Sequence, residues 1–176
     1  MTTYRMRTAR IALIAVAVFV VLSDVASAAP ASTTPEPAAT PFPCTNAIST
    51  AARPPTGYEA IAGVVALPTK KKFAGGDRRG SDGFRFAKQG LLVKTGASVE
   101  LIVPPAWAQR VNIAWGDAPR TTHLQITNCG TNPQVTWLVY AGGFYVTERA
   151  CVPLIVRAGG HDDKVHIAVG KSCSPK

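Results

Sequence analysis

The stretch QVTWLVYAGGFYVTERACVPLIVRAGGHDDKVHIAV, residues 134–169, decides the fold. It consists of short runs in which every second residue is apolar, a period that is typical of β-strands and not of helices. Glycine pairs at 142–143 and 159–160 break the runs with residues suited to turns. We therefore predict four strands in this stretch, at residues 134–141, 144–147, 151–157 and 164–169.

The same alternation continues upstream, and turn residues separate the runs. Further strands are predicted at residues 61–67, 84–88, 91–94, 97–103, 111–115 and 121–128. Residues 105–110, which follow Pro104, are expected to form only a short helical connector. This pattern predicts an all-β protein, an antiparallel β-sandwich of immunoglobulin-like or barrel-like type with about 8–10 short strands.

The N-terminus has the layout of a secretory signal peptide. Three arginines are followed by an apolar run over residues 11–22 and by the small residues Ala26-Ser27-Ala28, which predicts cleavage before Ala29. The alternative, a membrane anchor, needs roughly 20 apolar residues, and Asp24 interrupts the run too early. We expect a protein that is secreted or held at the cell envelope, with no transmembrane segment after cleavage. The frequent Ala, Arg, Val and Pro are typical of a bacterial secreted protein.

Residues 29–43 differ in composition from the rest of the chain. All of them except Glu36 and Phe42 are Pro, Ala, Thr or Ser, and five are proline. Such a segment favours an extended tether without regular hydrogen bonding, either bare or carrying O-linked sugars. Residues 44–176 are then expected to form a single domain.

The four cysteines, Cys44, Cys129, Cys151 and Cys173, all lie in that domain. An even number in an exported chain predicts two disulfides. A zinc site usually has its ligands in close pairs, whereas the nearest cysteines here are 22 residues apart. A final hairpin with Ala158 opposite Lys164 places Cys151 near Cys173, which favours the pairing Cys151–Cys173 with Cys44–Cys129. The pairing Cys129–Cys151 with Cys44–Cys173 remains open.

Catalytic motifs are not recognisable in the sequence. Gly80-Ser81-Asp82-Gly83 lacks the spacing of a hydrolase nucleophile motif. The carboxylates are scattered, and the three histidines (His123, His161 and His166) have no spacing specific for a metal. We therefore expect a non-enzymatic binding protein without a cofactor. The alternative is an extracellular hydrolase with a site assembled from scattered polar residues.

Positive charge is concentrated in one part of the chain. The formal charge is +9, and removal of residues 1–28 takes away three arginines and one aspartate and leaves +7. Residues 70–94 alone hold eight basic residues against two aspartates. A basic segment attracts anionic surfaces, so we expect a partner among anionic cell-envelope polymers or proteins and not a nucleic acid. The competing interpretation is a solvated loop.

Two groups of side chains are the candidate binding residues. The aromatic residues around the Gly142-Gly143 turn can contact a sugar or a protein if they are exposed. Trp137 and Phe144 are expected in the core, and Tyr140 and Tyr145 are expected to face outward. The complete candidate set is Lys70, Lys71, Lys72, Arg78, Arg79, Arg85, Lys88, Tyr140 and Tyr145.

Overall fold

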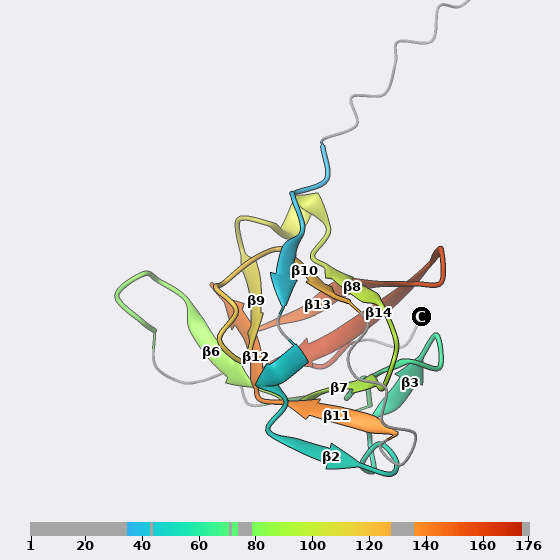
Figure 1. Cartoon of the computed structure of the whole chain (residues 1–176). Coiled ribbons are helices and arrows are strands. Elements are labelled where there is room, and N and C mark those ends of the chain that lie inside the picture. Colours follow the sequence, from blue (N-terminus) through green and yellow to red (C-terminus); the bar gives the residue numbers. More distant parts are fainter. Residues whose placement is uncertain (1–34, 43, 71, 74–78, 128–135, 174–176) are drawn as a thin grey trace, which may run out of the picture. The chain divides into compact units, whose positions relative to one another are not determined.

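The computed structural model of the chain describes residues 35–42, 44–70, 72–73, 79–127 and 136–173 (Figure 1). This part of the chain is built of strands and two short 3-10 helices, at Cys44–Asn46 and Pro105–Trp107. The strands are β1 Thr40–Phe42, β2 Ser49–Ala51, β3 Glu59–Ile61, β4 Val65–Leu67, β5 Lys72–Phe73, β6 Arg85–Lys88, β7 Leu91–Lys94, β8 Val99–Ile102, β9 Val111–Trp115, β10 His123–Ile126, β11 Trp137–Tyr140, β12 Gly142–Val146, β13 Ala150–Ala158 and β14 His161–Val169.

The strands form three hydrogen-bonded sheets. Sheet A has the order β1-β10-β8-β13-β14-β5, sheet B the order β2-β11-β7-β4-β3, and sheet C the order β6-β12-β9. All described pairings are antiparallel except β1 with β10 and β14 with β5. Long strands β13 and β14 pair along nine residues each and lie inside sheet A.

One core is shared by the three sheets. Leu101 of sheet A, Val93 of sheet B and Ile113 and Phe144 of sheet C are all 0% exposed and belong to the same cluster of packed side chains. The alternation in the sequence explains this arrangement, because each strand turns every second side chain toward the core. Burial of this apolar surface is the main driving force for folding.

The all-β class with antiparallel sheets is confirmed, and the finer assignment to a sandwich stays a prediction. The expected number of strands was too low, because the described residues form fourteen. Strands β1, β2 and β5 have only two or three residues each, too few to show a period. The predicted strand at 61–67 is instead the hairpin β3–β4. Ala62 and Gly63 have φ values of +49° and +69° and are the central residues of its turn, which a hydrogen bond from the Val64 N–H to the Ile61 carbonyl oxygen closes.

The final hairpin has a different register from the predicted one. Ala158 lies opposite His161, not Lys164, because Gly159-Gly160 adopt positive φ values and form the tightest turn. The disulfide Cys151–Cys173 is nevertheless confirmed, with a Cα–Cα distance of 5.0 Å. It forms because the chain turns after β14, where Gly170 bridges to Ala150. The other expected pair includes Cys129, which lies outside the described residues, so Cys44–Cys129 remains a prediction.

The segment before Cys44 takes part in the fold. Strand β1 pairs with β10, and Phe42 is 5% exposed with its ring centroid 4.9 Å from that of Tyr140. The predicted tether, residues 29–43, therefore includes a strand and a core residue. Proline at position 41 is tolerated because β1 is the edge strand of sheet A. The predicted signal peptide lies outside the described residues, and no described helix is long and apolar enough to cross a membrane.

Candidate functional site

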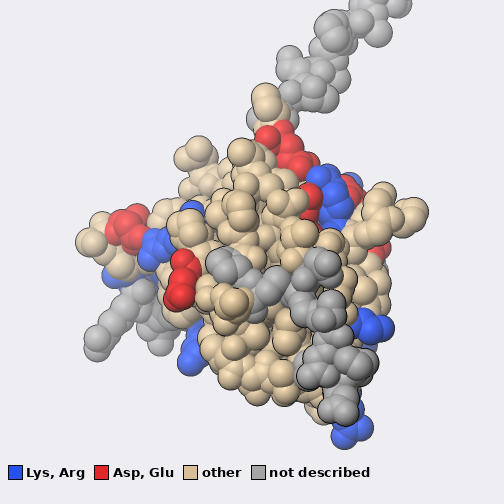
Figure 2. All heavy atoms as spheres, viewed as in Figure 1, with Lys and Arg blue, Asp and Glu red and all other residues tan. Residues whose placement is uncertain are grey.

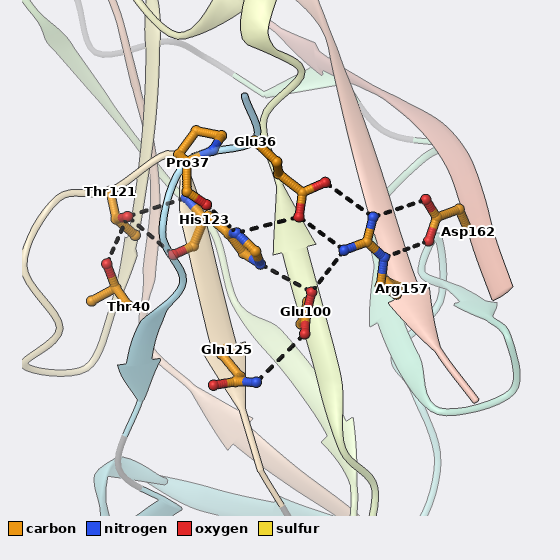
Figure 3. Close-up of polar contacts among 9 residues, drawn as sticks. All are labelled: Glu36, Pro37, Thr40, Glu100, Thr121, His123, Gln125, Arg157 and Asp162. Carbon is orange, nitrogen blue, oxygen red and sulfur yellow. Dashed lines mark hydrogen bonds and ion pairs between the residues drawn. The ribbon is translucent and has the colours of Figure 1, made fainter. Parts of the chain in front are cut away.

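A row of polar side chains crosses four neighbouring strands of sheet A (Figure 3). Gln125 of β10 lies opposite Glu100 of β8, Glu100 lies opposite Arg157 of β13, and Arg157 lies opposite Asp162 of β14. Their sequence neighbours Leu124, Leu101 and Val156 are buried in the core. Because side chains alternate along a strand, the polar row occupies the face of sheet A that points away from the core.

Arg157 is the centre of this group. Its guanidinium binds both oxygens of Asp162 at 2.7 and 3.1 Å and both oxygens of Glu36 at 2.9 and 3.1 Å. It also donates to Glu100 at 3.1 Å. Hydrogen bonds from Arg157 hold the pKa values of Glu36 and Asp162 below their usual range, and those to Asp162 and Glu36 raise the pKa of Arg157. The paired-fork geometry is the strongest form of such an ion pair.

His123 joins the N-terminal segment to the row. The imidazole is 4% exposed, its Nδ1 lies 2.8 Å from the carbonyl oxygen of Pro37, and its Nε2 lies 3.0 Å from Glu100 Oε2. A carbonyl oxygen only accepts, so Nδ1 carries a hydrogen and donates it. We call Glu36, Glu100, His123, Arg157 and Asp162 the Arg157 network.

The Arg157 network holds residues 36–42 on the domain. Glu36 and Pro37 precede β1, and Thr40 of β1 donates from its hydroxyl to that of Thr121 at 2.9 Å. These contacts and the pairing of β1 with β10 attach the segment at both its beginning and its end. The network therefore acts as a structural connection between the sheet and the polypeptide that leads into it.

Catalysis at the Arg157 network is not favoured by its geometry. Two hollows adjoin the network, one of about 240 Å³ beside Glu100 and Arg157 and one of about 760 Å³ beside Asp162, but these three charged groups are engaged with one another. Both glutamates already accept hydrogen bonds from Arg157, and the lowered pKa of Glu36 makes it a poor general acid. The His–carboxylate pair that a hydrolase would use is present, but it is engaged in internal contacts.

The same residues form a group with metal-ligand chemistry. Glu36, Glu100 and His123 offer ligand atoms that all lie within 4.8 Å of one another, and no other such group occurs in the described part of the chain. However, Nη1 of Arg157 lies 2.9 Å from Glu36 and 3.1 Å from Glu100. The guanidinium thus supplies the positive charge between the two carboxylates. His161 and His166, also considered from the sequence, are not part of this group.

The structure distributes the candidate basic residues over several elements. Lys70 follows β4, Lys88 ends β6, and both are exposed. Arg79 lies in the loop that leads into β6, and this loop projects from the sheets in Figure 1. Arg79 lies opposite Arg85 and donates to the carbonyl oxygen of Thr147 at 2.9 Å. Figure 2 shows dispersed blue atoms on this face, several beside red ones. Lys71, Arg78 and the side chain of Lys72 lie outside the described part.

The two candidate tyrosines have opposite environments. The expectation that Tyr140 faces outward is wrong, because Tyr140 is 0% exposed and packs against Phe42. Phe42 belongs to the segment predicted as a tether, so its role as a packing partner was not foreseen. Tyr145 is partly exposed on sheet C. Its ring lies 4.8 Å from that of Phe86, and the guanidinium of Arg120 lies 3.7 Å from its centroid.

Sequence reasoning missed the whole Arg157 network. The sequence placed Glu36 in the predicted tether and left Glu100 among the scattered carboxylates. The alternation did place Glu100 and Gln125 on polar sides of their strands, but the pairing of the strands was needed to bring them together. No known protein family, curated protein or solved structure matches the chain.

Proposed function

We propose that the chain is exported and acts outside the cytoplasm as a non-enzymatic protein that binds anionic polymers of the cell envelope. The observation that carries this proposal is the difference between its arginines and its lysines. Each ion pair among the described residues has an arginine or histidine as its cation, and none includes a lysine.

This difference decides which positive charges act on a partner. Three arginines and His123 contact five described carboxylates: Glu36, Asp82, Glu100, Glu148 and Asp162. Five exposed lysines with described side chains form no ion pair among the described residues: Lys70, Lys88, Lys94, Lys164 and Lys171. Of these, Lys164 lies close enough to Asp162 to help lower the pKa of that carboxyl group. Uncompensated charges produce a field that reaches about 8 Å at physiological salt and attracts anions.

Export follows from the N-terminal sequence and is part of the proposal. The apolar run and the Ala26-Ser27-Ala28 site favour removal of residues 1–28. N-terminal sequencing of the secreted protein should begin at Ala29 or within a residue or two of it. Recovery of the uncut chain from membranes would contradict this part.

The binding function is tested with the mature protein on an immobilised anionic polymer. Combined substitution of Lys70, Lys88 and Lys94 by Ser should lower retention and make it less dependent on salt, because fewer counterions are released. The matched control changes the same three lysines to Arg, which keeps the charge and should keep the retention. Equal retention of the Ser variant and the parent would refute the proposal.

A further inference from the structure

We infer that the outer face of sheet C is a sugar-stacking site, centred on Phe86 and Tyr145, for one ring of an anionic polysaccharide. The inference rests on the proposed function in one respect, namely that the ligand is anionic. It adds the chemical class of the polymer and the residues that distinguish a sugar from other anions.

The site is built by direct opposition of residues in three strands. Phe86 of β6 lies opposite Tyr145 of β12, which lies opposite Asn112 of β9. Their neighbours Ala87, Phe144 and Ile113 are buried. The row of Phe86, Tyr145 and Asn112 therefore points away from the core, and the same alternation puts Lys88 on this face, two residues beyond Phe86.

The aromatic pair is fixed in position and partly open. The Phe86 and Tyr145 rings have centroids 4.8 Å apart and are tilted by 33°. Arg120 covers one side of Tyr145 at 3.7 Å and is itself paired with Asp82. The Phe86 side chain is 39% exposed, and Ile48 is the only other large apolar side chain exposed in the described residues. A rigid, accessible ring remains for a ligand.

The surroundings of this ring suit a charged sugar. The apolar C–H face of a sugar packs on an aromatic face, while its hydroxyl groups stay in contact with polar groups such as Asn112. Lys88 lies about 6.6 Å along the strand from Phe86, within reach of a carboxylate or phosphate on a ring stacked there. Lys88 forms no ion pair among the described residues, and Arg79 in the loop into β6 donates to the backbone carbonyl oxygen of Thr147. The positive charge of Lys88 is complementary to an anion.

The next row of sheet C offers a ligand only one side chain. Gly143 lies opposite Lys88 and Ala114. Gly143 and Ala114 are both buried, whereas Lys88 is exposed. A ligand on this face therefore contacts the row of Phe86, Tyr145 and Asn112 and, beside it, Lys88. A lipid chain would need a deeper apolar surface than one exposed ring, which favours a polysaccharide.

The experiment compares three immobilised polymers: polygalacturonate, an anionic sugar polymer; polyglutamate, an anionic polymer without sugar; and dextran, a neutral sugar polymer. The mature protein should bind polygalacturonate about tenfold more tightly than polyglutamate, the order expected for one aromatic stacking contact. Phe86→Ala and Phe86→Leu should both remove this preference. Phe86→Trp should keep it, and Ile48→Ala, at the other exposed apolar side chain, should leave it unchanged. Thermal unfolding of each variant verifies the fold.

The outcomes separate the inference from the function on which it rests. If Phe86→Leu is folded and keeps the preference for polygalacturonate, the stacking site is refuted. If the parent binds both anionic polymers equally, charge alone acts; the inference fails while the proposed function stands. If the parent binds neither anionic polymer at low salt, the proposed function fails with it.

Discussion

Replacement of Tyr140 by Phe should stabilise the protein. The ring of Tyr140 is 0% exposed, and its hydroxyl group is buried without a hydrogen-bond partner among the described residues. Phe keeps the ring and its edge contact with Phe42 at 4.9 Å. The substitution thus removes a desolvated polar group and leaves the packing intact.

The size of the effect follows from the cost of a buried, unpaired hydroxyl. Such a group costs about 1–3 kcal/mol relative to a paired or apolar one. We expect Tyr140→Phe to raise the free energy of unfolding at pH 7 by about 1–2 kcal/mol. For a domain of this size that corresponds to a rise in Tm of about 4 °C per kcal/mol.

The pH dependence gives a second, independent measure. Burial raises the pKa of Tyr140 from 10.0 to about 12. Between these values the folded protein keeps the proton that the unfolded chain has lost, so stability falls as the pH rises. Over the whole interval between the two pKa values, the stability lost corresponds to about 3 kcal/mol. Tyr140→Phe lacks this group, and its advantage over the parent should therefore widen above pH 10.

Urea unfolding at pH 7, 9 and 10.5 measures both effects. The matched control is Tyr145→Phe, because Tyr145 is partly exposed on sheet C, and we expect it to change stability by less than about 0.5 kcal/mol. A loss of stability in Tyr140→Phe at pH 7, with no widening at high pH, would refute the reasoning. It would mean that the hydroxyl has a partner, for example an internal water.

Two further changes test the connections of the chain. Glu36→Gln should lower stability at pH 7 by less than about 1 kcal/mol, because Glu36 is 43% exposed. Hydrogen bonds from Arg157 depress the pKa of Glu36 from 4.5, so the contribution of Glu36 to stability is present above that pH and lost as the pH falls. In urea unfolding, the free energies of unfolding of the parent and the variant should become equal near pH 3. A difference that stays constant with pH would contradict this. Joint replacement of Cys151 and Cys173 by Ser opens a bridge that spans 22 residues and should cost about 3 kcal/mol; an unchanged urea midpoint would show that the bridge contributes nothing.

Strands of at least four residues with one buried face were largely predictable, but β12 begins at Gly142, so the predicted turn at Gly142-Gly143 is wrong. The predicted strand at 111–115 coincides with β9, and the predicted runs at 84–88 and 91–94 contain β6 and β7. A period of two residues needs several repeats, so the short strands β1, β2 and β5 gave no signal. Ala62 was read as part of a strand because its positive φ is unusual for a residue other than glycine.

The candidate site was less predictable because it depends on register. Arg157, Glu100 and Gln125 are far apart in the sequence, and only the pairing of β13, β8 and β10 brings them into one row. A shift by one residue would turn each of them to the opposite face. Glu36 adds a further difficulty, since its proline-rich surroundings are typical of a tether. The composition of this segment indicates an extended chain without regular hydrogen bonding, but it does not reveal that the segment packs on sheet A.

The two kinds of cation have separate physical roles in this protein. The planar guanidinium of Arg157 binds two carboxylates with two hydrogen bonds each, a geometry that the ammonium group of lysine cannot reproduce. The charges of Arg110, Arg120 and Arg157 are therefore paired with carboxylates within the fold. Lysine ammonium groups are strongly hydrated and stay at the surface. The exposed lysines that form no ion pair among the described residues contribute to the formal charge of +7 of the predicted mature chain, and a binding partner can neutralise them without breaking an ion pair of the fold.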